Sequence, residues 1–135
     1  MDTSASQFQE LLAHLIARTN KMLSQQGYAF PLGLFLDAGG RVEVSTATYE
    51  EPDQIGDVVN AMQSAMATRV AAGSAKASCI SVPDRSGKWV VAFLENDENY
   101  CAKVSIPIVG ESPSLDAENL AVDDGSILVF PVVSS

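Results

Sequence analysis

Two cysteines and one histidine are the side chains of this chain best suited to act as nucleophile, base or soft metal ligand. Cys79 and Cys101 fall in two segments of strand type, with a third such segment between them. Two strand spacings of ~4.8 Å exceed the ~7 Å Cα separation that a disulfide tolerates. A metal site would need further ligands at a suitable spacing. We therefore expect two buried free thiols, as in a reducing compartment.

His14 is the single histidine, so any histidine-based triad would have to use it. It projects from the polar side of a predicted helix, one turn after Glu10 and one turn before Arg18. A solvated histidine on a helix surface fits this position better than a catalytic base. The commonest zinc sites use several histidines or cysteines together and are not matched.

Acidic residues gather in the segments 95–99 and 123–124, where their oxygens could in principle hold a divalent cation. Neither segment has the ligand periodicity of a calcium-binding loop, and turns favour Asp and Asn for backbone reasons alone. The glycines of Asp37-Ala38-Gly39-Gly40 lead into a strand, whereas a nucleotide-binding loop leads from a strand into a helix. We expect no cofactor and no metal.

The charge composition of the chain indicates which classes of partner are not expected. The 135 residues include 17 acidic and 8 basic side chains, a net charge of −9. A chain this acidic repels phosphate groups, and it has no cluster of Lys or Arg, so neither nucleic acid nor an anionic membrane is an expected partner. No apolar run approaches the ~20 residues that span a bilayer, and residues 1–5 do not resemble a signal peptide. The cytoplasm is the expected compartment.

Two helices are predicted. The first covers residues 5–26, with Ser4 and Gln7 as a capping box and Gly27 just past its end. Its apolar stripe is Phe8, Leu11, Leu12, Leu15, Thr19, Met22 and Leu23. The second covers residues 52–72, starting at Pro52 and followed by Gly73. Its stripe is Ile55, Val58, Val59, Met62, Met66 and Val70.

Five strands are predicted around these helices. A hairpin pairs residues 32–36 with 41–45, and a three-stranded meander fills residues 77–109, with turns at 83–87 and 96–99. The fold class is therefore α+β, in one domain of residues 1–135. A core of order αββαβββ spans residues 1–109, with a five- or six-stranded antiparallel sheet. Residues 110–135 form an extension whose apolar run, 127–130, docks on the body, with a further strand as one possible form.

The register of the meander decides which side chains share a face. Four-residue turns would pair Phe93 with Ala102, Val91 with Val104 and Trp89 with Ile106. These side chains form one large apolar face, which we expect the helices to cover. The opposite face is of mixed polarity and is the predicted interface, covered by the tail, by a helix or by a second copy of the chain: Cys79, Val90, Ala92, Leu94, Cys101 and Lys103.

The succession helix, two strands, helix, three strands is similar to that of profilin-like and roadblock-type domains. That resemblance implies a five-stranded antiparallel sheet in the strand order 2-1-5-4-3. The segments 35–42, 91–96 and 125–130 also look like parts of small bacterial proteins with no assigned role. Neither resemblance brings catalytic residues.

These features favour a non-enzymatic, cytoplasmic interaction module of bacterial type that binds itself or another protein. One alternative is a small-molecule-binding protein or enzyme, with a pocket between the first helix, the sheet and the C-terminal segment. Another is a regulator of a small GTPase, by analogy with roadblock-type domains.

Overall fold

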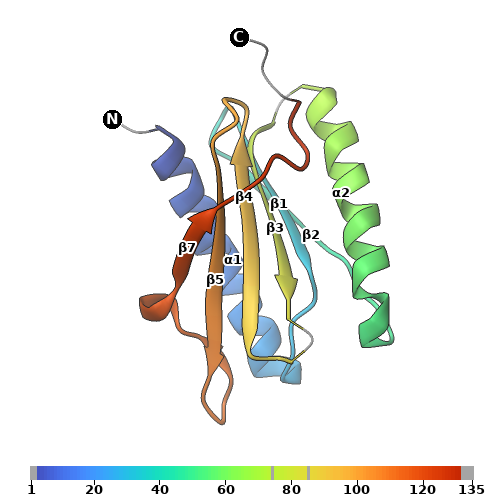
Figure 1. The fold of residues 1–135 in the computed structure, drawn as a ribbon, viewed down its shortest axis with the longest axis vertical. Helices are drawn as coiled ribbons and strands as arrows, with labels where there is room; N and C mark the ends of the chain where they lie inside the picture. Colours follow the sequence, from blue (N-terminus) through green and yellow to red (C-terminus); the bar gives the residue numbers. More distant parts are fainter. Residues whose placement is uncertain (1–2, 74, 85, 132–135) are drawn as a thin grey trace.

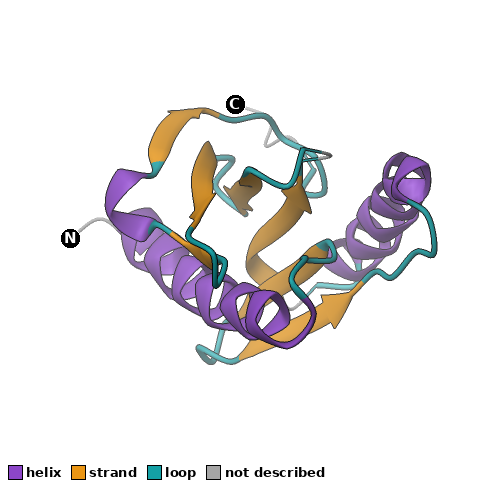
Figure 2. Ribbon diagram, turned by 90° about the horizontal axis from the view of Figure 1, so that it is seen from below, coloured by secondary structure: helices purple, strands orange, loops and turns teal. Residues whose placement is uncertain are grey.

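The computed structural model describes residues 3–73, 75–84 and 86–131. Its elements are α1 (Thr3–Gln26), β1 (Leu32–Asp37), β2 (Val42–Thr46), the 3₁₀ turn η1 (Pro52–Gln54), α2 (Ile55–Ala71), β3 (Ala75–Pro83), β4 (Trp89–Asn96), β5 (Cys101–Val109), β6 (Ser114–Leu115), the 3₁₀ turn η2 (Ala117–Asn119) and β7 (Ala121–Asp124). The predicted α+β class and the order αββαβββ are confirmed. The two helices lie on opposite faces of a twisted sheet (Figures 1 and 2).

The sheet is antiparallel, and its strands lie in the order β2-β1-β3-β4-β5, with β6 and β7 both paired to β5. The order 2-1-5-4-3 implied by the resemblance is therefore wrong, because β3 rather than β5 is the neighbour of β1. Three residues separate the end of α2 from the start of β3. A link this short delivers the chain to the nearest free strand edge, which is that of β1.

The predicted register of β4 against β5 is wrong by one residue. Phe93 lies opposite Lys103 and Val91 lies opposite Ser105. Asn96 N–H donates to the Tyr100 carbonyl at 3.0 Å, which leaves a three-residue loop. Asn99 in that loop has φ +63°, as three-residue hairpins require. A shift of one residue moves each β5 side chain to the other face relative to β4.

The predicted register of β3 against β4 is also wrong, but by two residues, so the faces are kept. Val82 lies opposite Val91, and Ile80 lies opposite Phe93. The Asp84 N–H donates to the Trp89 carbonyl at 2.8 Å, so the turn has the predicted length but begins one residue later. Because side chains alternate with a period of two, these residues still share one face.

The face that α1 covers is the main core. The helix buries Leu11, Leu15, Thr19 and Leu23 of its predicted stripe. Beneath it lie Cys79, Val90, Ala92, Leu94, Val104 and Ile106, each at most 2% exposed. Four of the six predicted interface residues are therefore buried beneath α1: Cys79, Val90, Ala92 and Leu94. Their small or branched side chains let the helix approach the sheet closely. The other two, Cys101 and Lys103, lie on the opposite face because of the register shift.

The start of α1 differs from the predicted capping box. The helix already includes Thr3 and Ser4, so Ser4 is not its N-cap. The buried Asn96 side chain instead donates through Nδ2 to Ser4 Oγ at 2.8 Å and to Gln7 Oε1 at 3.1 Å. These bonds join the first turn of α1 to the end of β4.

We call the sheet face opposite α1 the front face, and it carries a second core around α2. This core consists of Phe35, Met62, Met66, Val70, Ile80, Val129 and Phe130. Gly33 lets α2 approach β1, because a Cβ there would lie 2.8 Å from Met66 Sδ and 3.0 Å from Met62 Sδ. The second helix therefore covers only the β1 and β3 part of the front face (Figure 1).

The C-terminal extension docks on the body of the domain. Strands β6 and β7 pair with successive parts of β5 and form one edge strand that η2 interrupts. The chain then crosses the front face from β7 toward α2 (Figure 1). Val129 and Phe130 are buried there, without strand pairing. The strand lies instead at Ala121–Asp124, ahead of the apolar run 127–130 that was the predicted candidate for a further strand.

Candidate functional site

A large hollow lies on the part of the front face that α2 leaves open. Trp89, Val91 and Phe93 of β4 form its apolar wall, and Trp89 is 41% exposed. Ile55 and Gly56 at the start of α2 form the opposite side, and the volume is about 1000 Å³. We call this site the Trp89 hollow. Its β4 side chains were predicted to be ordinary core, because the predicted register placed them beneath the helices.

Charged groups lie at defined places in the Trp89 hollow. Lys103 comes from β5, directly opposite Phe93, and is half-buried. None of the ion pairs between described residues includes Lys103. Asp53 and Asp84 are exposed and lie at the rim. The hollow therefore combines an apolar wall, one cation and two carboxylates.

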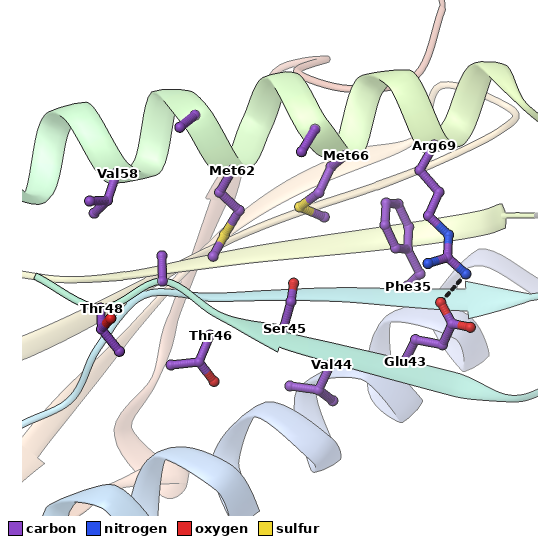
Figure 3. A pocket seen from close by; sticks show the side chains of 13 residues that line it. Phe35, Glu43, Val44, Ser45, Thr46, Thr48, Val58, Met62, Met66 and Arg69 are labelled. Atoms are coloured by element: carbon purple, nitrogen blue, oxygen red, sulfur yellow. Dashed lines mark ion pairs between the residues drawn. The ribbon is translucent and has the colours of Figure 1, made fainter.

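A second hollow, the α2–β2 groove, lies on the other side of α2. Its volume is about 870 Å³, and its wall is formed by Val58, Ala61, Met62, Ala65 and Met66 of α2. Figure 3 shows Val58, Met62 and Met66 pointing from α2 toward β2.

One end of the α2–β2 groove is closed by charged and aromatic groups. Arg69 forms an ion pair with Glu43 of β2, and its guanidinium lies 5.5 Å from the centre of the Phe35 ring (Figure 3). This contact ties the C-terminal end of α2 to the edge strand, so the groove keeps a defined width there.

Neither of these two hollows lies between the first helix, the sheet and the C-terminal segment, where a pocket was predicted. The α1 helix and residues 128–130 lie on opposite faces of the sheet. A smaller hollow of about 400 Å³ lies at the C-terminal end of α1 and includes Tyr28, Phe30 and Tyr49. Their rings meet edge to face at 5.4 and 5.1 Å. Burial, followed by the nearby Tyr28, raises the pKa of Tyr49.

The residues singled out for chemistry are not brought together. His14 lies on the exposed side of α1, with Nε2 3.4 Å from Glu10 Oε1. The described ranges contain no group of three or more His, Cys, Asp or Glu side chains that could hold a metal ion. Cys79 and Cys101 are both free, and they lie on opposite faces of the sheet. Burial raises the pKa of the Cys79 thiol to about 12.

The acidic segment 95–99 contains a residue whose role the sequence did not reveal. Glu95 is 1% exposed, on the front face. Its Oε1 accepts hydrogen bonds from the N–H groups of Val129 and Phe130 at 2.8 Å each, and Oε2 accepts one from Leu128 at 2.9 Å. The carboxylate thus holds the C-terminal segment against the sheet. The one sequence signal is an acidic residue inside an apolar strand.

Two further side chains hold the same segment. Gln63 of α2 donates to the Leu128 carbonyl at 3.2 Å, and Asn99 of the β4–β5 turn donates to the Pro131 carbonyl at 3.0 Å. Residues 128–131 are therefore bound from the sheet, from α2 and from the turn. This segment closes the upper end of the front face and leaves the Trp89 hollow open below it (Figure 1).

Comparison with known proteins gives no family for this chain. It matches no protein-family model, no curated protein and no solved structure. Within the described residues, neither helix has the length and apolar character needed to cross a bilayer. The geometry of the front face is therefore the basis for a functional proposal.

Proposed function

We propose that this chain is an interaction module without a chemical step of its own, and that it associates with a second copy through the Trp89 hollow. The observation that carries the proposal is an exposed Trp89 in an apolar hollow on the sheet face opposite α1. Exposed apolar surface of this kind, rimmed by polar groups, is typical of interaction sites.

The apolar contribution to association can be approximated from Trp89 alone. Tryptophan buries up to ~250 Å², so its 41% exposure leaves about 100 Å² of side-chain surface in water. At ~25 cal/mol per Å², covering this area would contribute about 2–3 kcal/mol in each copy. Val91 and Phe93, which are half-buried, would add to this amount.

The charges favour a second copy over an unrelated apolar surface. In a twofold interface, each residue meets the same surface from its partner, so a useful surface must be self-complementary. The Trp89 hollow has the cation of Lys103 beside Phe93 and the exposed carboxylates of Asp53 and Asp84 among its other lining residues. A twofold axis through the hollow would bring the Lys103 of each copy toward the carboxylates of the other. Such local pairs would offset the long-range repulsion between two chains of charge −9.

Sedimentation equilibrium combined with fluorescence tests this proposal, because Trp89 is the only tryptophan. We expect a monomer–dimer equilibrium and a red shift of the Trp89 emission on dilution, as the indole becomes exposed. Lys103→Glu should weaken the dimer. Trp89→Ala should give a monomer, whereas Tyr100→Ala removes another exposed aromatic side chain, at the far end of β4, and should leave the dimer intact. A wild-type chain that stays monomeric at all concentrations would refute the proposal.

A small-molecule ligand is the second candidate for the same hollow. The unpaired ammonium of Lys103 beside an apolar wall suits an apolar compound that carries a carboxylate or sulfonate. Titration with anilinonaphthalene sulfonate tests this candidate: saturable binding that Lys103→Gln removes, without a change in oligomeric state, would favour it over self-association. The small-GTPase alternative depended on the element order alone, and the observed strand order differs from the one that this resemblance implies.

A further inference from the structure

The edge strand β2 has unused backbone hydrogen-bonding groups beside the α2–β2 groove. The Asp37 N–H donates to the Arg41 carbonyl at 3.0 Å, and the Ala47 N–H donates to the Pro31 carbonyl at 3.0 Å. Because the pattern alternates along an antiparallel pair, Glu43 and Ser45 also face β1 with their backbone groups. The N–H and C=O groups of Val42, Val44 and Thr46 therefore point away from β1. No described strand pairs with β2 on that side.

The groove and the strand edge have matching lengths. On α2 the groove extends from Val58 to Arg69, eleven residue steps or about 16 Å at ~1.5 Å each. On the sheet side it extends from Glu43 to Thr48, five steps or about 16 Å at ~3.3 Å each. Figure 3 shows the two elements side by side along this length. An extended peptide of about five residues would fill it.

We infer that β2 and α2 form a binding site for an extended segment of a partner protein, which adds as a further strand to β2. Backbone groups of the segment would bond to Val42, Val44 and Thr46. Every second side chain would point into the groove and meet Met62, Met66 and the small residues Ala61 and Ala65. Addition of a strand beside a helix is an established mode of peptide recognition, in which the backbone gives affinity and the groove gives specificity.

The residues that line the α2–β2 groove determine which side chains the bound segment must carry. The groove wall is apolar except at its Arg69–Glu43 end, so the segment must be apolar at alternate positions. The chain carries a net charge of −9, which favours a segment with basic flanking residues.

A second copy of this chain fits the groove poorly. Its own β2 would direct Glu43, Ser45 and Ala47 toward α2, because these residues share the front face with Phe35. That would place a second carboxylate in the groove that already contains Glu43 and would offer the methionine wall only Ala47 as an apolar contact. The β2 edge and the Trp89 hollow also lie on opposite sides of α2, so each site can be occupied without the other.

The test is selection from a phage-displayed library of random peptides, followed by fluorescence polarisation with the selected peptides. We expect enrichment of sequences with apolar residues at every second position. Val44→Pro removes one outward N–H and leaves the ladder to β1 intact, whereas Val44→Ala shortens the same side chain and keeps that N–H. Loss of one hydrogen bond at about 1.4 kcal/mol predicts about tenfold weaker binding to Val44→Pro than to Val44→Ala.

A second pair of variants tests the α2 side of the groove without changing the backbone of β2. Ala65→Glu places a charge in the groove on an exposed position of α2, and Ala17→Glu places the same residue on the exposed side of α1. Only Ala65→Glu should abolish peptide binding. The inference is overturned if no alternating peptides are enriched, or if Val44→Pro and Ala65→Glu bind as well as their controls. It is also overturned if Val44→Pro removes self-association, which would assign the edge to a second copy.

Discussion

Replacing Glu95 by Gln should release the C-terminal segment from the sheet. The side chain keeps its size, but one oxygen becomes an NH₂ group. If the remaining oxygen faces Val129 and Phe130, the NH₂ group faces the N–H of Leu128, donor against donor. One hydrogen bond is then lost, and two change from charged to neutral.

The free energy of docking that Glu95→Gln removes can be estimated from these three hydrogen bonds. Hydrogen bonds to charged groups are worth about 1.5–3 kcal/mol and neutral ones about 0.5–1.5 kcal/mol. Losing one charged bond and neutralising two therefore costs about 4 kcal/mol. Docking of Val129 and Phe130 contributes about 3–6 kcal/mol by burial. Since the two amounts are comparable, the segment should detach while the rest of the fold persists.

Hydrogen exchange of individual amides measures this detachment. With about 1.4 kcal/mol for each factor of ten, the amides of residues 128–130 should exchange about a thousandfold faster in Glu95→Gln. Amides of β3 and β4 beneath α1 should keep their protection. Glu98→Gln is the matched control, because Glu98 is exposed in the neighbouring turn and the change in net charge is the same. Equal exchange of residues 128–130 in both variants would refute the role given to Glu95.

Four further predictions concern other parts of the fold. A thiol reagent at pH 8 should modify half-buried Cys101 rapidly and Cys79 only on unfolding, because the pKa of Cys79 is raised to about 12; loss of the fast phase in Cys79→Ala rather than in Cys101→Ala would contradict this. Since the folded state holds the Cys79 proton more tightly, this thiol should also lower the free energy of unfolding as the pH rises from 9 toward 12, and Cys79→Ala should reduce that slope in urea titrations. Gly125→Ala should weaken docking of residues 126–131, because its Cβ would lie 2.7 Å from the Ala102 nitrogen on β5; unchanged exchange of the residue 128–130 amides would show that the backbone has room there. Asn96→Ala should cost about 2–4 kcal/mol in urea unfolding, because the buried amide joins α1 to the β4–β5 turn, and a loss below about 0.5 kcal/mol would show that these bonds do not stabilise the fold.

The sequence predicted the helices and strands well because each carries its own periodicity. The stripe of α1 and the strand runs between Ala75 and Val109 are local patterns, and the structure keeps their bounds within a few residues. The relative faces of β4 and β5 were wrong because they depend on whether one turn has three residues or four. That difference rests on the left-handed conformation of Asn99. One residue in one turn thus exchanged the predicted core and the predicted open surface.

The candidate sites depend on contacts that no local pattern contains. The carboxylate of Glu95 binds backbone groups 33 to 35 residues later in the chain. From the sequence alone, Glu95 was interpreted as part of the acidic segment 95–99. Likewise, β7 is a strand because the free edge of β5 pairs with it, although Asp123 and Asp124 are unfavourable in strands. The Trp89 hollow and the α2–β2 groove follow from how far α2 extends over the sheet, which its sequence does not state.

The interrupted strand β6–η2–β7 makes the two edges of this sheet unequal. At the edge beside β5, η2 interrupts the strand that β6 and β7 form. The exposed Asp123 and Asp124 there repel an incoming strand of the same acidic chain. The β2 edge has neither feature. Strands can therefore be added at the β2 edge only, and the far edge of the sheet does not continue the pairing. Assembly through this sheet ends after one addition, so it gives finite complexes rather than fibres.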